Sequence, residues 1–167
     1  MNRLFVAVRP PSEVVARLDQ MAVRSIDGVR PVPAAQMHVT LRFLGDVDPA
    51  EVIGALAGFE PPPAVVRLGP RLTRLGRDAL VVPASGLDGV ANEVADRTRR
   101  LGERGGDRPF RGHLTVARLR RRTPPPRRWE EVDLTFPLAG VELISSTLTP
   151  TGAVHETLAT WTPGEGE

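Results

Sequence analysis

Two short segments of this sequence repeat a pattern of side chains that can exchange protons. Residues 38–41 are His-Val-Thr-Leu, and residues 113–116 are His-Leu-Thr-Val. The chain has three histidines, and two of them lie in these segments. An imidazole changes charge near neutral pH, so one histidine can accept a proton while another donates one. The repeat therefore predicts a shared site at which two histidines act together.

Both patterns lie in apolar stretches that are predicted to form β-strands. Alternate side chains of a strand point to the same face, so His38 and Thr40 share a face and lie about 7 Å apart along it. The same parity places His113 and Thr115 together, with the intervening apolar residues in a core. Hydroxyl groups beside paired imidazoles suit the binding of non-bridging phosphoryl oxygens.

Other histidine chemistries fit the sequence less well. A zinc site needs a third protein ligand, yet the remaining histidine is His155, and neither an HExxH segment nor an acidic cluster lies near the patterns. A nucleophilic triad needs a positioned serine or cysteine, and the sequence has no GxSxG segment and no cysteine. Paired acid–base catalysis without a metal remains, and it suits an ester that is already activated, such as a strained 2′,3′-cyclic phosphate.

The composition is that of one ordinary globular domain. Among 167 residues, 41% are hydrophobic and 25% are charged, which favours a single domain over residues 1–167. The absence of cysteine excludes disulfides, thiolate nucleophiles and iron–sulfur clusters. No apolar run approaches the roughly 20 residues of a membrane span, and the first residues are typical of a strand rather than a signal peptide. We expect a cytoplasmic protein, and a monomer because no heptad repeat occurs.

The positive charge is concentrated in one segment. All 22 basic residues are arginine, and the net charge is only +2. Residues 97–128 nevertheless contain 12 arginines and two acids, a local charge of +10 that surrounds His113. Such a concentration suggests a partner that carries phosphates, such as an RNA backbone. Arginines are densest over residues 118–128, which form either a solvated loop or a contact for that backbone.

The elements that position the two patterns follow a mixed order. Strands are predicted over residues 3–8, 37–44, 65–68, 71–75, 79–82, 113–119, 132–138, 141–148 and 154–160. Helices are predicted to begin at Ser12, Asp48 and Leu87, and the proline-rich residues 29–35 are predicted to form a loop. This order favours an α+β fold with antiparallel or mixed sheets. Neither GxGxxG nor GxxxxGK[ST] occurs, so no glycine-loop nucleotide site is indicated.

The two patterns resemble the paired HxTx motifs of the two-histidine (2H) phosphoesterase superfamily. Within it, the chain is most similar to the bacterial and archaeal RNA 2′,3′-cyclic phosphodiesterases, also called 2′-5′ RNA ligase-like proteins. The resemblance covers nearly the whole chain. It includes the opening strand (residues 3–7), the first motif (38–45), the surroundings of the second motif (108–110 and 117–118) and the closing hairpin (146–152 and 156–158).

This resemblance implies a bilobal α+β fold, with two pseudo-symmetric lobes whose antiparallel or mixed sheets are flanked by helices around a central cleft. It implies hydrolysis of an RNA 2′,3′-cyclic phosphate to a 2′-phosphate, with no metal and no cofactor. His38 would donate a proton to the leaving 3′-oxygen, and His113 would accept one from water. Thr40 and Thr115 would hold the phosphoryl oxygens. The reverse reaction, 2′-5′ ligation, follows from microscopic reversibility.

Strand parity decides where two arginines near the motifs point, and the third histidine lies in the closing hairpin. Arg42 shares the predicted face of His38, whereas strand parity turns Arg118 away from His113 unless a bulge intervenes. Both are candidate phosphate ligands. His155 stands where the family often has a tyrosine in the closing hairpin, and as an exposed strand residue it needs no function.

Three alternatives remain open at this point. The chain could be a phosphodiesterase for small cyclic nucleotides or 2′-5′ oligoadenylates. It could be a non-catalytic module that binds a cyclic-phosphate RNA end and leaves it intact. A plain interaction protein would lack salt-dependent affinity for RNA.

Overall fold

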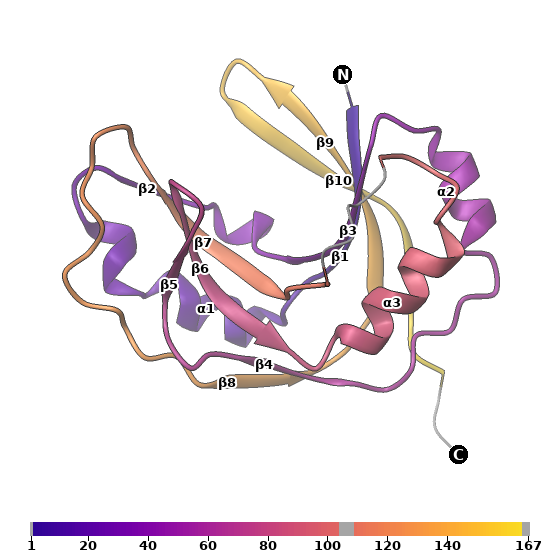
Figure 1. Ribbon diagram of the computed structural model, residues 1–167, viewed down its shortest axis with the longest axis horizontal. Helices are drawn as coiled ribbons and strands as arrows, with labels where there is room; N and C mark the ends of the chain where they lie inside the picture. The colour runs from indigo at the N-terminus through magenta and orange to yellow at the C-terminus, as the bar shows by residue number, and fades with distance from the viewer. Residues whose placement is uncertain (1, 104–108, 165–167) are drawn as a thin grey trace.

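Both histidine patterns lie in one curled sheet (Figure 1). The structure is a computed structural model that describes residues 2–103 and 109–164; Arg104 and Arg108 of the basic segment lie outside these ranges. The strands are β1 (Asn2–Val8), β2 (Val29–Pro31), β3 (Val39–Gly45), β4 (Val65–Leu68), β5 (Thr73–Leu75), β6 (Ala79–Ser85), β7 (His113–Leu119), β8 (Leu134–Pro137), β9 (Val141–Thr149) and β10 (Gly152–Trp161). The helices are α1 (Ser12–Asp19), α2 (Pro49–Ala55) and α3 (Asp88–Arg97), with short 3-10 turns η1 (Ala22–Ser25) and η2 (Ala34–Gln36).

The two motif strands are neighbours in the middle of the sheet. The strand order is β10-β9-β1-β3-β7-β6-β4-β8, and β3 pairs with β7 through Val39 and Leu114. Each half of this path thus begins at a motif strand and contains four strands. The pairings within the described residues are all antiparallel. The predicted α+β class is confirmed, and the arrangement agrees with a bilobal fold that carries one motif in each lobe.

The core confirms the predicted parity of the motif strands. Val39, Leu114 and Val116 are fully buried, and Leu41 is 6% exposed. These apolar side chains anchor the two strands, so the alternate positions, which carry the motif histidines and threonines, point to the other face.

The helices begin and pack as their sequences predict. At α2, the Asp48 side chain accepts a hydrogen bond from the Ala50 amide at 2.9 Å, and Pro49 occupies the first turn. Helix α3 buries Val90 and Val94 and lies against β3. No helix in the described part of the chain has the length and apolar character to cross a membrane.

The predicted loop over residues 29–35 contains two ordered elements instead. Strand β2 pairs with the end of β7, and η2 follows it and leads into β3. Pro31 is compatible with β2 because, among the described residues, this short strand pairs only with β7, so the missing amide hydrogen disrupts no second pairing there. Strands β2 and β3 therefore lie one after the other along the same edge of β7, which places β2 beside the motifs.

Candidate functional site

One cavity receives side chains from both motifs. It has a volume of about 720 Å³, and His38, Thr40, His113 and Thr115 all line it. Residues of β2, η2 and the β9–β10 hairpin complete its walls. Arg118 also lines the cavity, as do three residues that the sequence did not single out for a role here: Arg30, Gln36 and His155.

The ring of His38 is held at both nitrogens. Nδ1 lies 2.7 Å from the carbonyl oxygen of Gln36, and Nε2 lies 3.1 Å from Oγ1 of Thr40. A carbonyl oxygen only accepts hydrogen bonds, so Nδ1 carries the hydrogen in the neutral ring. The second nitrogen, Nε2, is thereby the one that gains and loses a proton beside the threonine hydroxyl.

His113 is held by the same local contact. Its Nδ1 donates to the carbonyl oxygen of Arg111 at 2.8 Å, again two residues earlier in the chain. This contact fixes the same tautomer and leaves Nε2 for proton exchange. Both motif histidines therefore have Nε2 as the nitrogen open to chemistry in the shared cavity.

His38 has a more enclosed environment than an ordinary surface histidine. The Phe5 ring stacks on it with centroids 4.8 Å apart. Burial lowers the pKa of His38, partly opposed by the hydrogen bond to the Gln36 carbonyl, and the positive charges of His155, Arg9 and His113 lower it further. A bound phosphate would act in the opposite direction, because a negative charge favours the protonated imidazole.

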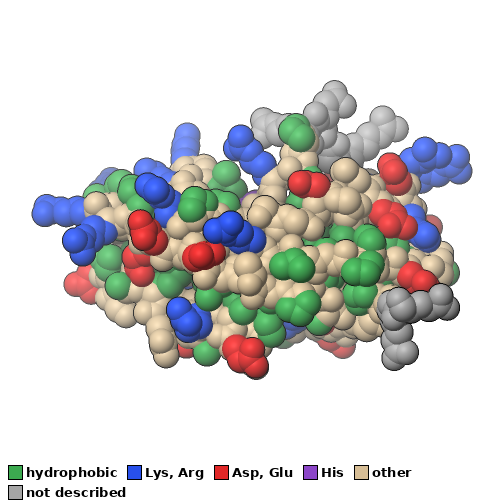
Figure 2. Space-filling view, turned by 90° about the horizontal axis from the view of Figure 1, so that it is seen from below, with side chains coloured by type: hydrophobic (Ala, Val, Ile, Leu, Met, Phe, Trp, Pro, Cys, Tyr) green, Lys and Arg blue, Asp and Glu red, His purple; other side chains and the backbone are tan. Residues whose placement is uncertain are grey.

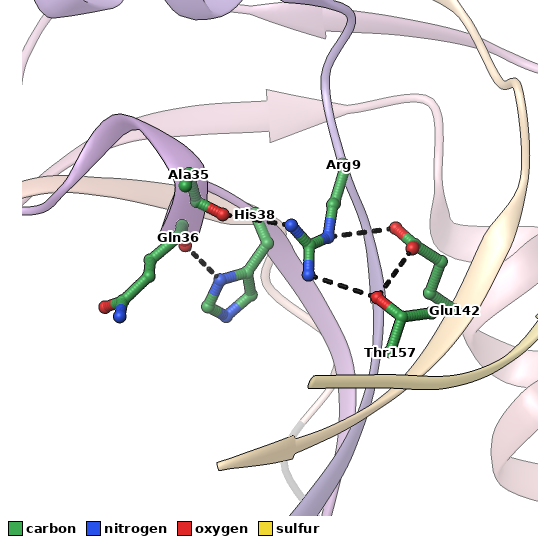
Figure 3. Close-up of polar contacts among 6 residues, drawn as sticks. All are labelled: Arg9, Ala35, Gln36, His38, Glu142 and Thr157. Carbon is green, nitrogen blue, oxygen red and sulfur yellow. Dashed lines mark hydrogen bonds and ion pairs between the residues drawn. The ribbon is translucent and has the colours of Figure 1, made fainter. Parts of the chain in front are cut away.

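Arg9 links η2, the turn that orients His38, to β10 at the end of the strand order (Figure 3). Arg9 donates to the Ala35 carbonyl in η2 at 2.9 Å and to Oγ1 of Thr157 in β10 at 3.2 Å. Its Nε lies 3.1 Å from the Glu142 carboxylate, which also accepts a hydrogen bond from Thr157 at 3.0 Å. Sequence reasoning missed this network, because nothing in the sequence distinguishes Arg9 from the other arginines.

A second contact ties the same turn to the hairpin. The Gln36 side chain donates to the Ala153 carbonyl in β10 at 2.6 Å. The residue whose backbone fixes the His38 tautomer is thus held through its own side chain, while Arg9 holds the residue before it. The orientation of His38 consequently depends on β10, although the two lie far apart in the sequence.

His155 lines the cavity, so it is not the exposed strand residue that the sequence suggested. It is half-buried, and its ring lies edge-on to Phe5 and His38, with centroids 5.4 and 5.7 Å apart. Its Nδ1 is buried and has no hydrogen-bond partner within the described ranges. Burial lowers the pKa of His155, and the charge of Arg9 lowers it further. Although three histidines line the cavity, the described residues include no group of three or more His, Asp or Glu side chains placed to hold a metal ion.

A bulge brings Arg118 to the cavity. Val81 of β6 pairs with Thr115, and the next residue, Leu80, pairs with Ala117, so Val116 is an extra residue in β7. The extra residue shifts the alternation of side chains between the two faces of β7. A bulge was the condition under which we expected Arg118 to share the face of His113, and the structure meets it. Its guanidinium lies 3.5 Å from the Asp78 carboxylate, and its side chain is 44% exposed.

Arg42 has a different place from the one that the sequence suggested. Its guanidinium donates to Oγ1 of Thr98 and, at 2.8 Å, to the carbonyl of Leu101. These contacts satisfy acceptors just after the C-terminus of α3, where positive charge is favourable. Arg42 is not among the residues that line the described cavity, so we do not propose it as a phosphate ligand.

Comparison with known proteins identifies relatives over most of the chain. The family model described as LigT like Phosphoesterase matches residues 8–69, which contain the first motif. A Thermus thermophilus protein named RNA 2′,3′-cyclic phosphodiesterase is 34% identical, over 93% of this chain and 87% of the relative. A relative with the same name from Archaeoglobus fulgidus is 27% identical, over 93% and 97%.

A solved structure has a similar fold over nearly the whole chain. The crystal structure of a Thermus thermophilus protein has a TM-score of 0.80 and 30% sequence identity, and the match covers 96% of this chain and 97% of that one. Sequence and fold thus agree over nearly the full length, including both motif strands. The chain belongs to the LigT-like phosphoesterase family.

Proposed function

We propose that this chain is a metal-independent hydrolase that opens the 2′,3′-cyclic phosphate at the end of an RNA and leaves a 2′-phosphomonoester. The observation that carries the proposal is the shared cavity, in which His38 and His113 adopt the same tautomer, each with Nε2 as the nitrogen that exchanges protons. The relatives named RNA 2′,3′-cyclic phosphodiesterase support the substrate class. One chain supplies both motifs, so we expect the monomer to be active.

His113 is the proposed base. Its neutral Nε2 takes a proton from a water molecule as the water oxygen bonds to phosphorus. The bond from phosphorus to the 3′-oxygen breaks, while the bond to the 2′-oxygen stays. The new hydroxyl remains on the phosphate, which gives the 2′-phosphomonoester.

His38 is the proposed acid. In its protonated form Nδ1–H is committed to the Gln36 carbonyl, so the transferable proton sits on Nε2. This proton passes to the departing 3′-oxygen and makes it a hydroxyl. The enclosed environment that lowers the pKa of His38 makes the protonated ring a stronger acid, and the charge of the bound phosphate favours its protonation. Run in reverse with an RNA 5′-hydroxyl in place of water, the same steps form a 2′-5′ linkage.

Thr40 and Thr115 are the proposed contacts for the non-bridging phosphoryl oxygens, and Arg118 adds a positive charge to the same cavity. All three line the cavity, and the two hydroxyls flank the two imidazoles. Positioned donors stabilise the charge that accumulates on these oxygens in the transition state. The two proton transfers and this stabilisation require no cofactor.

The test is an end-group assay in EDTA. An RNA oligonucleotide with a 2′,3′-cyclic phosphate is incubated with the purified protein, and the product end is identified. We expect a 2′-phosphate, lost in His38→Ala and in His113→Ala and retained in the remote control Arg17→Ala. A 3′-phosphate would contradict the proposed bond cleavage, and activity that EDTA abolishes and zinc restores would contradict the metal-free mechanism. Tight binding without turnover would favour an RNA-end binding module; no binding would favour small cyclic nucleotides or 2′-5′ oligoadenylates as substrates.

A further inference from the structure

Arg30 and Arg118 lie opposite each other on two paired strands, β2 and β7, that contribute to the cavity. In the β2–β7 pair, Arg30 is the direct partner of Arg118, and residues opposite each other in an antiparallel pair share a face. Both side chains line the cavity. The loop prediction for residues 29–35 concealed this relationship, because only an ordered β2 places Arg30 beside β7.

The pairing of Arg30 with Arg118 places two positive charges next to each other, and acidic side chains neutralise them only in part. Like charges directly opposite each other in a sheet are destabilising. Asp78 lies 3.5 Å from Arg118, but both side chains are about half exposed, at 44% and 55%. Arg30 forms no ion pair with any residue of the described ranges. An anion between the two guanidinium groups would relieve their repulsion.

The reacting cyclic phosphate does not account for both arginines. It carries one negative charge and is held in the proposed mechanism by the motif threonines and histidines. Thr115 and Arg118 pair with Val81 and Ala79, which are two residues apart in β6, so about 7 Å of strand separates the two positions. A second anionic group beyond the reacting one fits this placement, and an RNA supplies it because every further nucleotide adds one phosphate charge.

The positive charge continues beyond the cavity in the same direction. Strand β7 leads directly into Arg120, Arg121 and Arg122, which are exposed, and residues 118–128 contain no acidic residue. The Arg120 amide donates to the Gly28 carbonyl at 2.8 Å, which holds this segment beside the start of β2. Arginine side chains project from this end of the molecule at the left of Figure 2. A bound chain that leaves the cavity here would meet further cations.

We propose that Arg30 and Arg118 together bind the phosphodiester that precedes the terminal nucleotide of the substrate. This inference rests on the proposed function, and it makes the enzyme selective for an RNA end over a 2′,3′-cyclic mononucleotide. Arg30 is the specificity-determining residue, because the proposed reaction itself gives it no contact with the reacting phosphate.

The test compares two substrates: a 2′,3′-cyclic mononucleotide and a short RNA ending in the same cyclic nucleotide. We expect Arg30→Ala to lower kcat/KM for the RNA about tenfold more than for the mononucleotide, the size of one charged hydrogen-bond contact. Arg30→Lys should restore part of the difference. Arg17→Ala, which removes the same charge from α1, should leave both values unchanged. An equal loss on both substrates, or no loss on either, would overturn the subsite.

A binding measurement separates this proposal from the proposed function. With the labelled RNA, Arg30→Ala should weaken affinity about tenfold and lower the slope of log affinity against log salt by about 0.7, as expected for one phosphate contact in a single strand. Unchanged affinity and slope would overturn the subsite whether or not the wild-type protein turns over. If neither substrate is hydrolysed but RNA binding depends on Arg30, the subsite stands and the proposed hydrolysis fails.

Discussion

His38 and His113 orient their rings in the same way: each Nδ1 donates to the backbone carbonyl two residues earlier, at 2.7 Å in one and 2.8 Å in the other. The carbonyl belongs to Gln36 in η2 for His38 and to Arg111, just before β7, for His113. In both cases the contact comes from the backbone that enters the motif strand. The two halves of the sheet thus supply matched Nε2 atoms to one cavity, one for each proton transfer of the proposed reaction.

Replacing either histidine with asparagine tests this shared arrangement. The asparagine amide can still donate to the carbonyl that holds Nδ1. Asparagine, however, has no group in the place of Nε2 that can exchange protons. We expect His38→Asn and His113→Asn each to lower kcat about 10²- to 10⁴-fold while the melting temperature stays close to that of the wild type. A loss of activity that follows a loss of folded protein would show a structural role instead.

Thr40 tests the proposed contact to the phosphoryl oxygen. Its hydroxyl lies 3.1 Å from Nε2 of His38, so it is placed beside the transferable proton. Thr40→Val keeps the shape and removes the hydroxyl, and we expect kcat to fall about 10²-fold. Thr40→Ser keeps the hydroxyl and should retain most of the activity. Equal rates for the two variants would exclude a role for the hydroxyl.

Arg9 tests the electrostatic control of His38. The proposed acid must be protonated, so kcat/KM falls as the pH rises through the pKa of His38. The positive charge of Arg9 is one cause of the lowered pKa. We expect Arg9→Gln to raise that pKa, which moves the basic limb of the pH–rate profile to higher pH. Arg9→Lys keeps the charge without the full set of hydrogen bonds, so its limb should stay in place; a shift in both variants would assign the effect to the orientation of η2.

The lowered pKa of His38 also predicts how stability depends on pH. The unfolded chain binds a proton near the ordinary histidine value of 6.5, whereas folded His38 binds it only at lower pH. Between these values the unfolded state holds more protons, so the free energy of unfolding decreases as the pH falls below about 6.5. Urea denaturation at about pH 7.5 and about pH 5 should show a smaller decrease for His38→Asn than for the wild type. An identical decrease would mean that His38 does not contribute.

The sequence was sufficient for the parts of the fold that depend on local pattern. Alternating apolar residues correctly predicted the whole of β7 and the burial of Val39 and Leu114. Strand β2 was missed because its proline signals a loop, and only pairing with β7 stabilises it. The sequence raised a bulge before Arg118 only as a condition and could not establish it, because the bulge at Val116 is visible only in the register between β7 and β6.

The supporting residues of the site were missed for a related reason. Arg9 contacts Ala35, 26 positions later, and Thr157, 148 positions later. Gln36 reaches Ala153 across 117 positions. Contacts at such separations are set by the order of strands in the sheet, and a single sequence carries no local pattern for them. The reacting residues were recognisable because their chemistry is confined to four-residue segments.

Arg42 and Arg118 provide a matched pair for the last prediction, since both lie on motif strands and sequence reasoning gave both the same role. Arg42 donates to Thr98 and Leu101 at the end of α3, so Arg42→Ala leaves these acceptors without their donor. We expect its free energy of unfolding to fall by about 1.5–3 kcal/mol with kcat/KM of the folded protein nearly unchanged. Arg118 lines the cavity and its ion pair with Asp78 is half exposed, so Arg118→Ala should lower kcat/KM about tenfold or more with little change in stability. Denaturation and kinetics, measured on the same preparations of the two variants, distinguish these roles. If Arg42→Ala impaired turnover without loss of stability, Arg42 would have to be reinstated as a phosphate ligand, as its place in the first motif suggested.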